Sequence, residues 1–230
     1  MIDSRIRTVL KFVKRGSRVA DVGADHGYLS LELINSGRAS RVIATEKNQH
    51  PFEALSKNIS GVAGIEARLG DGLKVLTAGE VDTICIAGMG GALIAKILDE
   101  APQVVQASRA LILQPMNGAD KVRQWLALHD WTIADEDLAE EAGIIYEIIC
   151  ADNVTLPPMS ETKTFSREVS PLREKFSEQR LKKLQRVLGE MSKSPSARAS
   201  EKFSALQAEV DALKNHSQEN IMTRLKEVPT

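Results

Sequence analysis

Cysteine and histidine are scarce in this chain of 230 residues, which contains two cysteines and four histidines. The cysteines, Cys85 and Cys150, lie in apolar stretches, and the histidines are scattered along the sequence. Neither residue type shows the spacing of a zinc site, so we expect no metal. Two cysteines in apolar surroundings indicate reduced, buried side chains, as is usual in a cytoplasmic protein.

Long apolar runs are also missing from the sequence. No stretch approaches the roughly 20 apolar residues that a membrane span needs, so we expect no contact with a membrane. The basic N-terminal segment is not followed by an apolar core and a small-residue cleavage site, so we expect no signal peptide. Hydrophobic residues make up 43% and charged residues 27% of the chain, which is ordinary for a soluble globular protein.

Charge is distributed unevenly, although the net charge is only −1. Residues 1–155 contain 16 Lys/Arg and 21 Asp/Glu, whereas residues 156–230 contain 14 and 10. The basic residues that could contact an RNA are Arg5, Arg7, Lys11, Lys14 and Arg15 near the start, and Arg180, Lys182, Lys183 and Arg186 near the end. Two basic ends around an acidic middle can hold a polyanion, but solvated helix faces would give the same pattern.

Short apolar segments alternate with amphipathic segments as far as residue 152. The expected strands cover 18–23, 41–46, 65–69, 81–87, 110–113, 131–139 and 144–151, and the expected helices cover 2–13, 27–36, 50–60, 91–100 and 118–129. Five alternations predict an α/β fold, in which helices cover both faces of a parallel sheet. The closing hairpin is typical of the seven-strand sheet of Rossmann-like methyltransferases and is usually absent from nicotinamide-binding domains.

The C-terminal part has a different pattern. Pro157 and Pro158 indicate a linker, and Pro171 suits the first turn of a helix capped by Ser170. Apolar residues then recur in steps of three and four at Leu181, Leu184, Leu188 and Met191, and again at Phe203, Leu206, Val210 and Leu213. A break at 194–196 separates the two segments, which predicts an antiparallel helical hairpin, or coiled coil, within 160–230.

The segment after the first expected strand reads Asp21-Val22-Gly23-Ala24-Asp25-His26-Gly27. Its glycines allow a sharp turn and close approach to a ligand, at the edge where open α/β sheets bind ligands. A dinucleotide loop needs a glycine where Asp25 stands, and this carboxylate would repel a pyrophosphate. It would attract the ammonium and sulfonium groups of S-adenosylmethionine, which favours this cofactor over NAD. An ordinary glycine-rich turn remains the alternative.

Further candidate ligand contacts follow the second and third expected strands. Glu46 can accept hydrogen bonds from ribose hydroxyls, but NAD enzymes use an acid in the same way, and a surface carboxylate is the alternative. Asp71 and Gly72 could receive the adenine ring of a cofactor. Because Asp-Gly is also a common turn, the two interpretations have equal weight.

The fourth expected strand leads into the segment Gly88-Met89-Gly90-Gly91, where three glycines permit close approach by cofactor or substrate, or form a tight turn. The segment lacks the Asn-Pro-Pro-aromatic pattern with which many enzymes methylate exocyclic amino groups, which argues against that reaction. After the fifth strand, Gln114 and Asn117 offer amide groups suited to the edge of a base, although each could equally be a turn or cap residue.

Together these segments resemble the TrmK family, the bacterial tRNA (adenine-22-N1)-methyltransferases. The resemblance depends on Ala20–Leu29, Ile86–Gly91, Ile112–Pro115, Val122–Leu126 and Tyr146–Ile148. It covers residues 1 to about 152 in order and continues into the helical tail. The family often has two asparagines after the Gln-Pro pair, whereas Met116 occupies the first of these positions here and leaves Asn117 as the better candidate.

The resemblance implies a methyltransferase domain at 1–155, a coiled-coil domain at 160–230, S-adenosylmethionine as cofactor and tRNA as substrate. It places Asp21, Gly23, Asp25 and Gly27 in the cofactor turn, Glu46 on the ribose, Asp71 and Gly72 near the adenine, and Gly88, Met89 and Gly90 between cofactor and base. Asp25, His26, Gln114 and Asn117 become the candidates for acting on the acceptor base. We expect a monomer or a weak dimer.

Other functions fit parts of the same pattern. A methyltransferase could act on another RNA, a protein or a small molecule. A nicotinamide-dependent oxidoreductase would share the sheet and Glu46, but the glycine spacing disagrees and no catalytic Tyr-x-x-x-Lys pair is present. A catalytically silent RNA-binding or scaffolding protein could also retain the fold.

Overall fold

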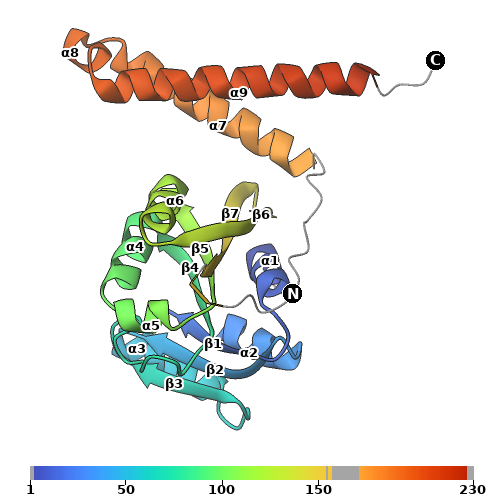
Figure 1. Cartoon of the computed structure of the whole chain (residues 1–230), viewed down its shortest axis with the longest axis vertical. Coiled ribbons are helices and arrows are strands. Elements are labelled where there is room, and N and C mark those ends of the chain that lie inside the picture. Colours follow the sequence, from blue (N-terminus) through green and yellow to red (C-terminus); the bar gives the residue numbers. More distant parts are fainter. Residues whose placement is uncertain (1–2, 154, 157–170, 227–230) are drawn as a thin grey trace. The chain divides into compact units, whose positions relative to one another are not determined.

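The first part of the chain contains seven strands, shown in the computed structural model of Figure 1. They are β1 (Ser17–Val22), β2 (Ala39–Glu46), β3 (Ile65–Leu69), β4 (Thr83–Gly90), β5 (Ala110–Asn117), β6 (Trp131–Glu141) and β7 (Ile144–Asn153). They form one sheet in the order β3-β2-β1-β4-β5-β7-β6. The first five pair in parallel, and β7 runs antiparallel to both β5 and β6. This arrangement confirms the predicted seven-strand sheet with a closing hairpin.

Helices cover both faces of this sheet. They are α1 (Ser4–Phe12), α2 (Tyr28–Asn35), α3 (Gln49–Asn58), α4 (Gly91–Asp99), α5 (Pro102–Gln106) and α6 (Ala119–Leu128). Alternate residues of a strand point to opposite faces, so Ile84 and Ile86 of β4 join the apolar cluster beneath α4 and α6. The intervening Cys85 joins the cluster beneath α1 and α2, which explains why β4 is apolar on both sides.

The structure describes residues 3–153, 155–156 and 171–226, and the chain divides into two units, Met1–Phe165 and Ser166–Thr230. The linker expected at Pro157 and Pro158 and the cap expected at Ser170 lie outside the described residues. Helix α5 was not predicted, because its five residues are too few to show a periodic pattern. None of the described helices is long and apolar enough to cross a membrane.

The second unit contains α7 (Pro171–Met191), α8 (Pro195–Arg198) and α9 (Glu201–Lys226). The residues with helical spacing form its core, in which Leu184, Leu188 and Val210 are buried between α7 and α9. The predicted break contains a short helix, because Ser194 Oγ accepts a hydrogen bond from Ala197 N and caps α8. The paired helices agree with the predicted hairpin, whereas its coiled-coil geometry stays a prediction.

Candidate functional site

A cavity of about 880 Å³ opens at the carboxyl ends of β1, β4 and β5. Strand β1 lies between β2 and β4, so the strand order changes direction at this point of the sheet. Open α/β sheets bind ligands at such a switch point. Helices α1 and α2 complete the wall of the cavity. Of the predicted site residues, the wall contains Asp21, Gly23, Asp25, His26, Gly88, Met89 and Gln114.

Backbone hydrogen bonds fix the loop that follows β1. Gly23 N and Ala24 N both donate to Thr45 O, at 2.9 and 3.0 Å, and Gly27 N donates to Ala24 O at 2.7 Å. Gly23 has a φ of +70°, and a Cβ atom there would lie 2.2 Å from Met89 Cε. Because these three amides already have acceptors within the protein, they cannot also bind a pyrophosphate.

Asp21 supplies a buried carboxyl group to the cavity wall, with only 4% of the residue exposed. Its Oδ2 accepts a hydrogen bond from Ser30 Oγ at 2.6 Å. Burial raises the pKa of Asp21 to about 6, and the hydrogen bonds from Ser30 oppose this shift only in part. An ionised carboxylate in this position is costly unless a positive charge lies beside it. The group therefore favours a ligand that carries a cation.

Asp25 and His26 lie at the exposed side of the cavity. Asp25 has a φ of +50°, in the left-handed region that residues other than glycine seldom adopt. Its side chain is 70% exposed and lies 3.8 Å from His26 Nε2. Asn58 Nδ2 donates to His26 O at 3.0 Å and so connects the loop to α3. The loop is held in one conformation that presents a carboxylate and an imidazole toward the solvent.

Several predicted residues lie outside the cavity wall, among them Gly27, Glu46, Asp71, Gly72, Gly90 and Asn117. Glu46 ends β2 and accepts a hydrogen bond from Asn48 N at 3.0 Å. Hydrogen bonds from Lys74 and then Lys47 lower the pKa of Asp71, whose carboxylate lies 3.2 Å from each lysine nitrogen. Ligand contacts for these residues stay predictions.

The ends of β4 and β5 continue the cavity wall beside β1. Gln114 is fully buried, and its Oε1 accepts a hydrogen bond from Gly88 N at 3.0 Å. Gly88 has a φ of +79°, and a Cβ atom added there would meet nothing within 4 Å. Asn117 instead packs against Gly90, because a Cβ atom at Gly90 would lie 3.3 Å from Asn117 Oδ1. The structure thus brings Gln114, but not Asn117, to the cavity.

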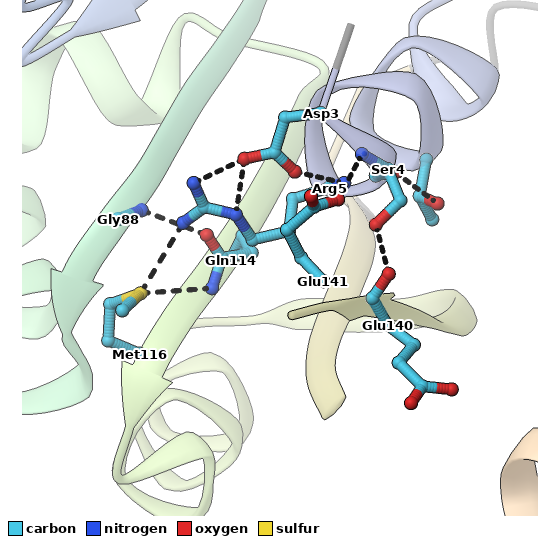
Figure 2. A network of polar contacts seen from close by, with 9 residues as sticks. Asp3, Ser4, Arg5, Gly88, Gln114, Met116, Glu140 and Glu141 are labelled. Carbon is cyan, nitrogen blue, oxygen red and sulfur yellow. Dashed lines mark hydrogen bonds and ion pairs between the residues drawn. The ribbon is translucent and has the colours of Figure 1, made fainter. Parts of the chain in front are cut away.

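Helix α1 contributes residues that the sequence did not predict for the cavity. Asp3 and Arg5 both belong to the wall, although Arg5 was expected to contact RNA phosphates. Arg5 Nε donates to Asp3 Oδ2 at 2.9 Å. Figure 2 shows the Arg5 side chain directed toward Asp3 and Met116. Ser4 Oγ donates to Glu140 O at 2.6 Å and so fastens α1 to β6. No sequence pattern gives this position, which depends on contacts between distant segments.

The remaining basic candidates differ in their surroundings. Lys11 pairs with Asp137 at 3.2 Å, Arg15 donates to Ser36 O at 3.3 Å, and Arg180 pairs with Glu209. Lys14 is half-buried, whereas Arg7, Lys182, Lys183 and Arg186 are exposed. Contact of these residues with RNA stays a prediction. Within 3–153, 155–156 and 171–226, no group of three or more His, Cys, Asp or Glu side chains is placed to hold a metal ion.

Comparison with known proteins agrees with this architecture. Residues 2–149 match the family described as "Methyltransferase domain". The fold and the cavity at the switch point therefore define a methyltransferase domain.

More specific relatives cover most of the chain. The crystal structure of the Bacillus subtilis m1A22 tRNA methyltransferase TrmK is 30% identical, with a TM-score of 0.78, and the match covers 94% of this chain and 98% of that one. Sp1610 of Streptococcus pneumoniae is 34% identical, with a TM-score of 0.79, and the match covers 94% of this chain and 99% of that one. The chain belongs to the TrmK family.

One curated relative matches over a shorter length. The tRNA (adenine(22)-N(1))-methyltransferase of Bacillus subtilis is 39% identical over 154 residues. That match covers 66% of this chain and 65% of the relative, so it spans just under two thirds of the relative's length. A further structure of Sp1610, 33% identical, contains S-adenosyl-L-methionine and has a TM-score of 0.77, with 94% of this chain and 99% of that chain covered.

Proposed function

We propose that this protein transfers a methyl group from S-adenosylmethionine to N1 of the adenine at position 22 of tRNA. The observation that carries the proposal is the cavity at the switch point. Its wall combines a buried carboxyl group, Asp21 of β1, with a fixed amide two strands away, Gln114 of β5. The name of the curated Bacillus subtilis relative and the ligand of the Sp1610 complex support the same reaction.

The charges of the cavity suit S-adenosylmethionine. Asp21 and Asp25 would hold its cationic end, because both carboxyl groups line the wall and the amides of Gly23 and Ala24 between them are already hydrogen-bonded to Thr45 O. Glu46 ends the neighbouring strand and would accept hydrogen bonds from the ribose hydroxyls. When bound, the cofactor supplies an electrophilic methyl group on a sulfonium.

Positioning of the acceptor base is the main task of the protein residues. N1 of adenine has a free lone pair, so no side chain has to remove a proton before attack. This atom lies on the Watson–Crick edge, so the base must be unpaired or flipped into the cavity. Asp25 would accept a hydrogen bond from the adenine amino group and so orient N1. Gln114 is less suited to that role, because its Oε1 already accepts a hydrogen bond from Gly88 N.

Exposed basic residues would hold the tRNA backbone. Arg7 in the first unit and Lys182, Lys183 and Arg186 in the second are exposed and can contact phosphates. We expect a monomer or a weak dimer, and a tRNA substrate implies a cytoplasmic protein.

Methyl transfer to unmodified tRNA tests the proposal directly. The purified protein is incubated with S-adenosylmethionine and a tRNA transcript, and the modified nucleoside is mapped by mass spectrometry. 1-Methyladenosine is expected at position 22, and a transcript with guanosine there should remain unmodified. Methylation at an amino nitrogen, or only of another RNA or a small molecule, would contradict the proposal.

A further inference from the structure

Two hydrogen-bond donors of the cavity wall, one from Arg5 and one from Gln114, converge on the sulfur atom of Met116, which lies beside the cavity. Arg5 Nη1 lies 3.6 Å and Gln114 Nε2 lies 3.9 Å from Met116 Sδ. Dashed lines mark both contacts in Figure 2. Arg5 comes from α1 and Gln114 from β5, so only the tertiary fold brings the two donors together. A thioether is a weak acceptor. Both donors would gain from a nitrogen or oxygen acceptor in its place.

Both donors are held in fixed orientations. Gln114 is fully buried, and its amide cannot turn over because Oε1 accepts from Gly88 N. The Arg5 guanidinium is held by Asp3 through Nε and Nη2, and its Cζ lies 5.1 Å from the centroid of the Tyr146 ring. Nη1 is therefore directed away from Asp3, toward Met116.

Met116 differs from both donors because it can leave its position. It is 44% exposed, and a methionine side chain has three rotatable bonds. Its sulfur therefore occupies a place that an entering ligand can take without disturbing the fixed donors.

The chemistry of the two donors selects one edge of adenine. The Watson–Crick and Hoogsteen edges each present the amino group, itself a donor, beside one ring nitrogen, so a pair of donors fits neither. The remaining edge presents N3, and in RNA the ribose 2′-hydroxyl oxygen lies beside it. Two acceptors on that edge match two donors in the wall.

The charge of the pair also suits the base. Asp3 offsets the positive charge of Arg5, with which it forms an ion pair. The adenine becomes positively charged when N1 is methylated, and a guanidinium without a partner would then repel it. A phosphate, in contrast, would meet the carboxylate of Asp3.

We propose that Gln114 Nε2 donates to N3 and Arg5 Nη1 donates to the 2′-hydroxyl oxygen of the target adenosine, both replacing Met116 Sδ. Gln114 is assigned to the base because it is the deeper residue, whereas the Arg5 side chain is 28% exposed. This inference rests on the proposed function, and it names Arg5 as a residue that selects RNA over DNA at the target position.

The test combines protein variants with tRNAs altered at one nucleotide. The tRNAs carry adenosine, 2′-deoxyadenosine or 3-deazaadenosine at position 22, and kcat/KM is measured for each. Arg5→Ala should lose about tenfold or more on adenosine, but little on 2′-deoxyadenosine. Gln114→Glu keeps an acceptor for Gly88 N and removes the donor, so it should lose activity on adenosine but little on 3-deazaadenosine.

Arg7→Ala is the matched control, because Arg7 lies on the same helix and is exposed. It should reduce kcat/KM by one common factor on all three tRNAs. The inference is overturned if Arg5→Ala and Gln114→Glu each lower kcat/KM by the same factor on all three tRNAs. If Arg5→Ala does not fold, the comparison of adenosine with 3-deazaadenosine in Gln114→Glu is the test, and equal losses on the two overturn the inference. Absence of methylation by the unaltered protein on the unmodified tRNA with adenosine at position 22 would instead contradict the proposed function.

Discussion

Replacing Asp21 with asparagine should stabilise the protein and weaken the binding of its cofactor. Asparagine has nearly the same shape, and its side-chain oxygen can still accept the hydrogen bond from Ser30 Oγ. The substitution removes a negative charge that is buried beside Cys85 on the neighbouring strand. The carboxylate lowers the stability of the fold, and its proposed role at this position is to bind a cationic ligand.

The size of the effect follows from the pKa of Asp21. Burial raises this pKa from 3.8 to about 6, so the unfolded chain loses the proton at a lower pH than the folded protein does. Stability should therefore decrease from about pH 4 to pH 6 and stay constant above that range. This difference in pKa between the unfolded and folded states lowers the free energy of unfolding by about 3 kcal/mol at pH 7.5, and by about half of that at pH 5. Asp21→Asn removes the carboxylate and should raise the free energy of unfolding by a large part of this loss at each pH.

Urea unfolding of the full chain measures the gain. Both tryptophans, Trp125 and Trp131, lie in the first unit, so tryptophan fluorescence reports on the unit that contains Asp21. Asp120→Asn is the control, because Asp120 is an exposed carboxylate in the first turn of α6 and should change stability by less than about 1 kcal/mol. A variant that is no more stable than the native protein at pH 7.5, or whose gain is equal at pH 5, would refute the reasoning.

Calorimetry with S-adenosylmethionine measures the other half of the prediction. Asp21→Asn should increase the Kd by about tenfold or more, since a hydrogen bond to a charged group is lost. In the native protein, affinity should fall as the pH drops below about 6, because the cation must then displace a proton from Asp21. Unchanged affinity in the variant would remove Asp21 from the cofactor site.

Three further predictions concern other parts of the molecule. Asp25→Gly tolerates the positive φ and removes the carboxylate, so kcat should fall by about 100-fold, whereas the Kd for the cofactor in calorimetry should rise less than in Asp21→Asn, because the Asp25 side chain is 70% exposed. Gly91→Ala would place a Cβ atom 2.0 Å from Gly118 O, so urea unfolding should show a loss of about 2 kcal/mol or more. Replacing Lys182, Lys183 and Arg186 together with alanine should weaken tRNA binding and reduce its salt dependence in filter-binding assays, and an unchanged salt slope would contradict a phosphate contact.

The sequence indicated which strand ends meet at the cavity, but it did not indicate every side chain that faces the cavity. Gly23, Gly88 and Gln114 could be placed at one edge because the carboxyl ends of parallel strands lie together. Asn117 was expected beside Gln114 on the assumption that the strand ended at residue 113. Strand β5 instead continues to Asn117, and residues three apart in a strand face opposite sides.

Arg5 shows the limit most clearly. Its position in a cluster of basic residues indicated contact with RNA phosphates, and charge patterns contain no further information. Its place in the cavity depends on the packing of α1 against the sheet, which includes the hydrogen bond between Ser4 and Glu140, 136 positions apart in the chain. Only the docking of α1 on the terminal hairpin reveals it.

The positions of two carboxylates in the cavity, Asp21 and Asp3, suit the transfer of charge in the proposed reaction. Methyl transfer moves one positive charge from the sulfonium to the adenine ring, so the total charge within the cavity does not change. Asp21 is buried near the end of β1 and has no cationic partner among the described residues, whereas Asp3, at the start of α1, is paired with Arg5. In the proposed reaction, the unpaired carboxylate would attract the cationic cofactor, and the paired one would lie beside the neutral base. Because neither carboxylate has to gain or lose a proton during transfer, the same protonation state serves both sides of the reaction, and no general base is required.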